Sequence, residues 1–165
     1  MGQTRIGLHG VLNGPSAVRQ VHFRHGTAPA ATVVVPSVFV AARDDPGRLL
    51  LVRRWDSGAW ELPGGRVEVG ESVLDAAVRE TVEESGVLVR ITGVVGLFTD
   101  PAHVVVSATG REVRQQFVVC LHAWGMRGRP VPDGKETIDA ACSIRRMSRS
   151  SRWNSGPAGG SHRHC

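Results

Sequence analysis

Residues 65–87 read GRVEVGESVLDAAVRETVEESGV, and no other stretch of the chain is as informative about its structure. Ser72 followed by Asp75 is a variant of the capping box that opens a helix, and Gly86 suits the left-handed residue that closes one. The sequence therefore predicts a helix that begins at Ser72 and ends before Gly86. Four apolar residues lie near helical spacing and are expected to form its buried stripe: Leu74, Ala77, Val78 and Val82.

The same helix carries three carboxylates on one face, because Glu80, Glu83 and Glu84 lie at i, i+3 and i+4. Like charges at this spacing destabilise a helix by roughly 0.2–0.5 kcal/mol per pair. Arg79 is expected to point away from them, so the neutralising charge has to come from outside the helix. A solvated acidic face is the simpler interpretation of the three glutamates alone. A hard divalent cation such as Mg²⁺, which prefers oxygen ligands, is the alternative.

The wider pattern favours the cation. Seven residues stand at fixed spacing, and Val87 closes the pattern: Gly65, Glu71, Arg79, Glu80, Glu83, Glu84 and Gly86. This arrangement resembles the Nudix box, a loop–helix–loop signature of enzymes that hydrolyse a diphosphate linked to another group. The resemblance covers about residues 36–140 and implies an α/β fold, a Nudix-type α/β/α sandwich with a mixed β-sheet. It implies structural roles for Gly65, Glu71, Arg79 and Gly86. Glu71 and Arg79 are expected to pair and so fix the loop against the helix.

The resemblance also implies a pyrophosphohydrolase that uses Mg²⁺ (or Mn²⁺). The implied metal ligands are the carboxylates and one backbone carbonyl, from Glu80, Glu83, Glu84 and Gly64. A metal-activated water attacks a phosphorus of the diphosphate, and one carboxylate takes the water proton. In some relatives this base is a glutamate of the box, and in others it comes from a later loop, where Glu136 stands here. Glu112 is a weaker candidate for the base.

Apolar, β-branched runs predict four strands, at residues 33–43, 49–54, 87–98 and 112–124. Pro36 argues that the first of these begins at Ser37 instead. Residues 44–47 (DDPG) predict a turn that joins the first two strands into a hairpin. Several strands around one helix predict a mixed sheet.

The 165 residues are expected to form one domain, at 32–140, between two basic ends. Residues 1–31 form a loose basic arm with one short strand near residues 18–23. The Arg/Ser/Gly-rich tail, residues 141–165, holds five arginines and no acid, so it carries the whole formal net charge of +5. We expect no ordered structure in this tail.

Substrate recognition falls outside the box. Arg53, Arg54, Trp60 and Gln116 are the expected substrate-binding residues: the arginines for a phosphate, Trp60 for stacking or core packing, and Gln116 for a base edge. Tyrosine is absent from the chain, which argues against dinucleoside-polyphosphate hydrolases. Pro101 follows the box where ADP-ribose pyrophosphatases often have a proline. ADP-ribose or a nucleotide sugar is favoured, and a nucleoside triphosphate, including an oxidised purine nucleotide, is the alternative. A non-catalytic nucleotide sensor is the competing class.

The expected partner is a small-molecule nucleotide. The sequence has no apolar run near the ~18 residues of a membrane span, so no membrane contact is expected. The basic tail could hold nucleic acid through phosphates, but a solvated end is favoured. Many relatives are dimers, which leaves a homodimer open. Three cysteines without framework spacing, and no signal-peptide apolar region, predict a cytoplasmic protein.

Overall fold

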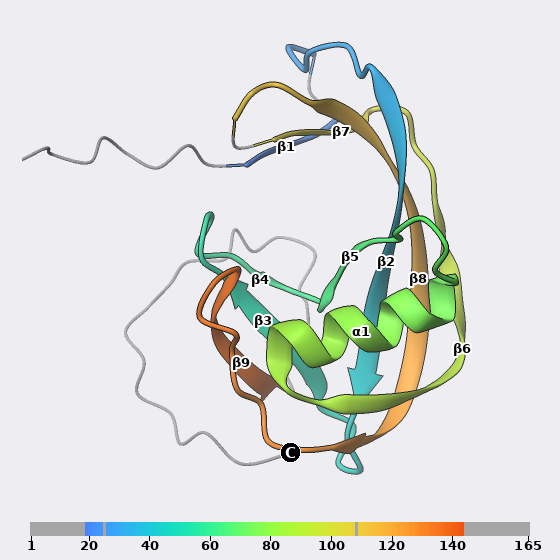
Figure 1. The fold of residues 1–165 in the computed structure, drawn as a ribbon, viewed down its shortest axis with the longest axis vertical. Helices are drawn as coiled ribbons and strands as arrows, with labels where there is room; N and C mark the ends of the chain where they lie inside the picture. Colours follow the sequence, from blue (N-terminus) through green and yellow to red (C-terminus); the bar gives the residue numbers. More distant parts are fainter. Residues whose placement is uncertain (1–18, 25, 108, 144–165) are drawn as a thin grey trace, which may run out of the picture.

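The computed structural model describes residues 19–24, 26–107 and 109–143, and these form one curled sheet with a helix packed on it (Figure 1). The strands are β1 (Gln20–Phe23), β2 (Val33–Arg43), β3 (Leu49–Arg54), β4 (Trp60–Glu61), β5 (Gly64–Arg66), β6 (Leu88–Phe98), β7 (His103–Val106), β8 (Val113–Arg127) and β9 (Thr137–Ser143). The helix α1 spans Val73–Ser85.

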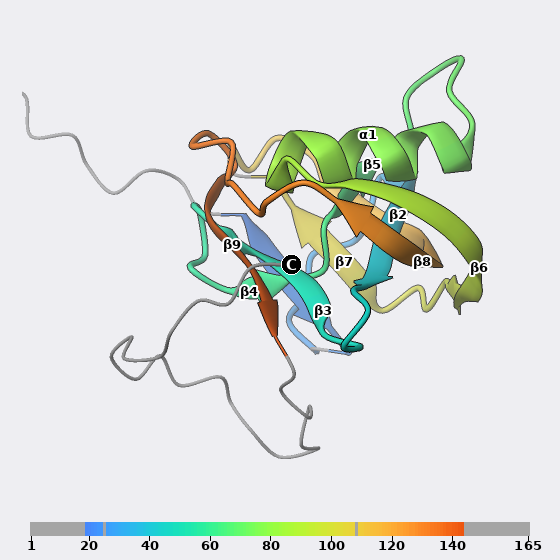
Figure 2. The same cartoon turned by 90° about the horizontal axis from the view of Figure 1, so that it is seen from below.

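The sheet is mixed, as the sequence predicts. Its main path runs β1-β7-β8-β2-β3-β4, with β5 on β2, β6 on β8 and β9 on β3. The long strands β2 and β8 pair in parallel from Val33↔Arg114 to Arg43↔Trp124, and the other pairings are antiparallel. Seen from below, α1 covers one side of the curled sheet (Figure 2). Among the described residues α1 is the one α-helix, so the second helical layer of the expected sandwich is not part of them.

The helix begins and ends where the sequence predicts. Ser72 is the N-cap, and its hydroxyl accepts a hydrogen bond from the backbone N–H of Asp75. Gly86 closes the helix with a left-handed φ of 66°, and its N–H bonds to the carbonyl of Val82. Such a φ is strained for a residue with a Cβ, which is why glycine stands there.

The predicted apolar stripe of the helix is wrong in part. Leu74 and Val82 are 55% and 40% exposed, whereas Ala77 is fully buried. The face that packs on the sheet is made of small residues: Ala76, Ala77, Thr81 and Ser85. The two hydroxyls can face the core because each bonds to the carbonyl four residues earlier in the helix. Small side chains let α1 approach the sheet closely, so size rather than hydrophobicity selects its buried face.

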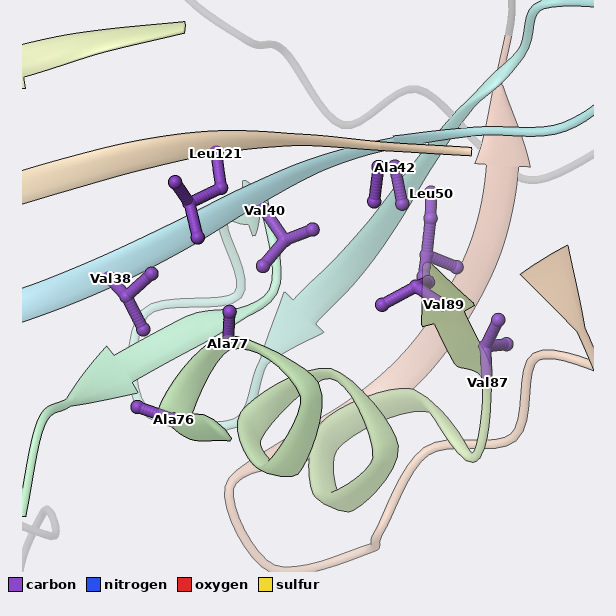
Figure 3. Close-up of a cluster of buried hydrophobic side chains, with 10 residues drawn as sticks. Val38, Val40, Ala42, Leu50, Ala76, Ala77, Val87, Val89 and Leu121 are labelled. Atoms are coloured by element: carbon purple, nitrogen blue, oxygen red, sulfur yellow. The ribbon is translucent and has the colours of Figure 1, made fainter. Parts of the chain in front are cut away.

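The core lies between α1 and the strands beneath it. Figure 3 shows Ala77 pointing toward Val38 and Val40 of β2, with Val87 and Val89 after the helix closing one end. The buried cluster comprises Val38, Val40, Ala42, Leu50, Ala76, Ala77, Val87, Val89, Leu121 and Ala123.

Strand β2 begins at Val33, so the expectation that Pro36 delays the strand to Ser37 is wrong. The carbonyl of Pro36 accepts a hydrogen bond from the N–H of Val67, on the side of β2 away from β8. Because the N–H and C=O of one residue point the same way in a strand, the missing N–H of Pro36 also faces away from β8, and the ladder with β8 loses nothing.

Four strands were not expected, β4, β5, β7 and β9, and β9 bears on the domain limits. Residues 141–143 belong to β9 and pair with β3, so the ordered domain passes the expected boundary at residue 140. The expectation for residues 144–165 lies outside the described residues.

In the part of the chain that the structure describes, no helix has the length and apolar character needed to cross a membrane. Cys120 is a free, buried thiol.

Candidate active site

Glu84 is the most deeply buried of the three helix glutamates, with 4% of its surface exposed. Its carboxylate accepts hydrogen bonds from the backbone N–H of Gly64 at 2.9 Å and from Arg54 at 3.0 Å. Burial nevertheless raises the pKa of Glu84 to about 7, and the nearby charges of Glu80 and Glu136 act in the same direction. Glu84 therefore changes charge near neutral pH in the absence of a further cation.

Glu80 lies against the short strand β5. A Cβ added to Gly65 would stand 2.4–2.7 Å from the Glu80 carboxyl group, so any side chain there would displace this carboxylate. Burial raises the pKa of Glu80, and Arg79 partly offsets the shift. Gly64 has no room for a side chain, because a Cβ there would meet the backbone carbonyl oxygen of Val38 at 2.1 Å. The double glycine thus allows β5 to lie between α1 and β2.

Arg79 does not point away from the glutamates, which corrects the expectation. Its guanidinium forms two hydrogen bonds with Glu71, at 2.7 and 2.9 Å, and contacts Glu80 at 2.9 Å and Glu83 at 3.1 Å. It also donates to the backbone carbonyl of Arg66 at 3.1 Å. The hydrogen bonds that Arg79 donates to Glu71 raise the pKa of Arg79, so it stays charged. Arg79 therefore fixes the 66–71 loop against the helix, as expected, and also partly neutralises the cluster.

Glu136 is brought to the helix glutamates by a tight loop before β9. The carboxylate of Asp133 accepts the backbone N–H groups of Lys135, Glu136 and Thr137, which fixes the loop conformation. The hydroxyl of Thr137 donates to the carbonyl of Glu84 at 2.8 Å. Glu136 itself is exposed, and its charge acts on the pKa of both Glu80 and Glu84.

Arg54, at the end of β3, joins the two carboxylates. Its guanidinium contacts Glu84 at 3.0 Å and Glu136 at 3.2 Å, and it lies 3.5 Å from Asp56. Burial opposes its charge, but Asp56 and Glu84 outweigh this and the pKa of Arg54 is raised. Arg54 thus faces the glutamates, whereas Arg53 bonds the carbonyl of Gly58 in the turn before β4.

The donor set suits a hard cation. Among the described residues no group of three or more His, Cys, Asp or Glu side chains is closed around one metal position, since Arg79 and Arg54 engage the glutamates. Mg²⁺ does not require such a cage, because it binds through one or two carboxylates and keeps several waters. Glu80 and Glu84 have pKa values raised by burial and by the charges of neighbouring carboxylates, and they lie beside a glycine backbone with no side chain in the way, which fits this mode.

The remaining substrate-binding candidates, Gln116 and Trp60, lie on different strands. Gln116 is 5% exposed on β8 and accepts a hydrogen bond from the hydroxyl of Ser37 at 2.9 Å. Trp60 is half-buried on β4 and pairs in register with Arg53. Pro101 lines a cavity of about 370 Å³ with Arg24 and Ala102, among others.

Sequence reasoning missed a second charged cluster. Arg66 and Arg114 both contact the carboxylate of Glu112, the weaker candidate for the base. A signal was present: Arg114 and Gln116 lie at i and i+2 of a strand whose middle is apolar, so they share one face.

The family model of the NUDIX domain matches residues 33–159, most of the chain. The chain belongs to the Nudix family. A Bacillus subtilis relative provisionally named as an 8-oxo-dGTP diphosphatase is 43% identical over 63 residues, 38% of this chain and 42% of the relative. A MutT-like protein of Streptomyces ambofaciens is 39% identical over 50% of this chain and 52% of its own length. An ADP-ribose pyrophosphatase of Methanocaldococcus jannaschii is 39% identical over 33% of this chain and 34% of its own length.

The Nudix chain thus spans about half the length, or less, of these curated relatives. Among solved structures, a MutT Nudix hydrolase from Burkholderia pseudomallei superposes with a TM-score of 0.53 at 23% identity, over 70% of this chain and 90% of that one. The MutT protein of Methanosarcina mazei gives 0.53 at 21% identity, over 70% and 80%. At these identities the likeness shows the Nudix fold alone.

Proposed function

We propose that this Nudix protein is a Mg²⁺-dependent hydrolase that cleaves the diphosphate linkage of a nucleoside-diphosphate-linked compound, with ADP-ribose or a nucleotide sugar favoured. The observation that carries the proposal is the meeting of Glu80, Glu83 and Glu84 with Glu136, which is more than 50 residues away in sequence. A fold gains no stability from gathering four carboxylates, so the cluster is accounted for by function.

Each side chain has a place in this scheme. Glu80, Glu83 and Glu84, with the carbonyl of Gly64, would hold the cation. When bound, the cation polarises the phosphoryl oxygens and lowers the pKa of water. Glu136 is exposed and Arg54 positions its carboxylate, which would accept the proton of the attacking water. Arg54 would then stabilise negative charge on the phosphates.

A second function has specific support. One of the relatives, provisionally named an 8-oxo-dGTP diphosphatase, bears a name that points to an oxidised purine nucleoside triphosphate. A housecleaning pyrophosphohydrolase acting on oxidised purine nucleotides is therefore the alternative substrate assignment. Both functions use the same glutamates.

Turnover decides between them. The full chain is incubated with Mg²⁺ and ADP-ribose, nucleotide sugars or (deoxy)nucleoside triphosphates, and released phosphate or monophosphate is measured. Glu83→Gln removes one charge from the cluster and is expected to lower kcat/KM at least about 100-fold. The control is Glu68→Gln, which removes an exposed carboxylate from the loop before the helix and should leave turnover unchanged. No turnover of any compound by folded wild-type protein would favour a nucleotide sensor.

A further inference from the structure

Arg114 has unused hydrogen-bonding capacity. Its side chain is 17% exposed, and a guanidinium group carries five N–H donors. Among the described residues its one hydrogen bond is to Glu112, at 3.4 Å, which is long for this type of contact. The buried Nε of Arg114 has no acceptor in the part of the chain that the structure describes. A largely buried cation with one weak partner is costly unless something else supplies acceptors.

The surrounding charges leave an excess of positive charge. Arg66 and Arg114 share the single carboxylate of Glu112, so two cations face one anion. Burial lowers the pKa of Arg114, and the nearby charges of Arg66 and Arg19 lower it further. The cluster is therefore short of one negative charge.

Neutral donors lie beside these cations. Ser37 pairs in register with Arg66, so the two side chains share a face of the sheet, and Ser37 bonds to Gln116. Because the Gln116 Oε1 is occupied by this bond, its amide NH₂ is left as donor, and it has no acceptor in the described structure. Gln116 and Arg114 are neighbours on the same face of β8.

This cluster is continuous with the helix glutamates. Arg19 lies 3.6 Å from Asp56, Asp56 lies 3.5 Å from Arg54, and Arg54 contacts Glu84 at 3.0 Å. On the other side, the backbone carbonyl of Arg66 accepts a hydrogen bond from Arg79. A ligand bound at Arg114 therefore lies beside the same set of charges that surrounds the glutamates.

We propose that Arg114, with Arg66 and Gln116, binds a phosphate group of the nucleotide and so positions the substrate beside the glutamates of α1. The assignment rests on the proposed function for its substrate class. Arg114 and Arg66 supply charge-assisted hydrogen bonds to phosphate oxygens, and Gln116 donates to a further oxygen of the nucleotide. A phosphate provides both the acceptors and the negative charge that the cluster lacks.

Binding of inorganic pyrophosphate, measured by calorimetry on the full chain in EDTA, tests the site without requiring turnover. Arg114→Ala is expected to weaken this binding about 10- to 100-fold, the loss typical of hydrogen bonds to a charged group. Arg111→Ala removes the same charge from an exposed position three residues away and should bind as wild type does. Arg114→Lys keeps the charge but loses the planar fork, so an intermediate loss is expected.

Equal affinity of Arg114→Ala and wild type, or no pyrophosphate binding by wild type, would overturn the assignment. If Arg114→Ala does not fold, Arg114→Lys and Arg66→Ala decide, and wild-type affinity in both overturns it. The turnover panel is independent of this result. Arg114-dependent binding without turnover of any nucleotide would remove the proposed hydrolase and leave the phosphate site standing.

Discussion

Glu84 combines near-complete burial with a position beside two other carboxylates, and both raise its pKa to about 7. Arg54 and the N–H of Gly64 limit the shift but do not cancel it. Without a bound cation, ionisation of Glu84 therefore works against folding. A cation placed between the carboxylates would reverse this effect.

This gives a pH-dependent prediction for the metal-free protein. A carboxyl with a folded-state pKa of about 7 and an ordinary value of 4.5 binds more protons when folded, so its contribution to the free energy of unfolding falls as pH rises from about 4.5 to 7. Glu84→Gln lacks this group. The stability of Glu84→Gln relative to wild type should therefore increase between pH 5 and pH 8, by on the order of 3 kcal/mol at most.

Urea unfolding in EDTA at the two pH values measures the difference. Glu68→Gln serves as the control, since that carboxylate is exposed and its relative stability should not change with pH. A constant difference between Glu84→Gln and wild type across the range would contradict the raised pKa.

At the residue scale, the sequence placed Glu80, Glu83 and Glu84 on one face of a helix, because positions i, i+3 and i+4 of a helix share a face. It misplaced Arg79, which as an i, i+4 neighbour of Glu83 could reach the cluster. Arg66, Arg114 and Arg19 were missed because their meeting depends on three separate strands or segments. The i, i+2 spacing of Arg114 and Gln116 places these two on one face of a strand, but it does not show that Arg66 lies beside them.

The helix is the element whose limits were most predictable. Caps are local, so Ser72 and Gly86 marked its ends correctly, whereas its rotation depends on how close it lies to the sheet. That rotation follows from small residues and turns Glu84 inward. The strands β7 and β9 were missed because their local sequence does not show that they pair. β7 is short, and β9 has a mixed sequence, TIDAACS, that becomes a strand by pairing with β3.

The cap supplies a test at this scale. Ser72→Ala removes the acceptor for the N–H of Asp75 and should lower the free energy of unfolding by about 1 kcal/mol. Turnover should stay within about twofold, because Arg79 still ties the helix to the preceding loop. Ser72→Thr keeps the cap and should retain wild-type stability. Urea unfolding of both variants measures the effect, and equal loss in both would argue against the cap.

Across the whole molecule, the site joins parts of unequal stability. Helix α1 packs over β2, β5 and β6, whereas β9 pairs only with β3 among the described strands. Glu136 stands just before β9, so it depends on the less supported part. Local openings of this kind cost less free energy than global unfolding.

Native-state hydrogen exchange should detect this difference. Amides of residues 140–143 in β9 are expected to exchange through openings of lower free energy than the amides of β2 and β8. Turnover in low denaturant should fall before the helical signal does, since Glu136 is lost first. Exchange of β9 only at the free energy of global unfolding would show that the sheet opens as one unit.

The parallel pairing of β2 with β8 has a consequence for synthesis on the ribosome. The eleven register pairs from Val33↔Arg114 to Arg43↔Trp124 join residues about 80 positions apart. The glutamate helix is therefore translated well before β8, the strand that completes the sheet below it. Until residue 124 has left the exit tunnel, β2 lacks its partner strand β8. The nascent chain therefore contains the acidic helix before the sheet on which the helix packs is complete.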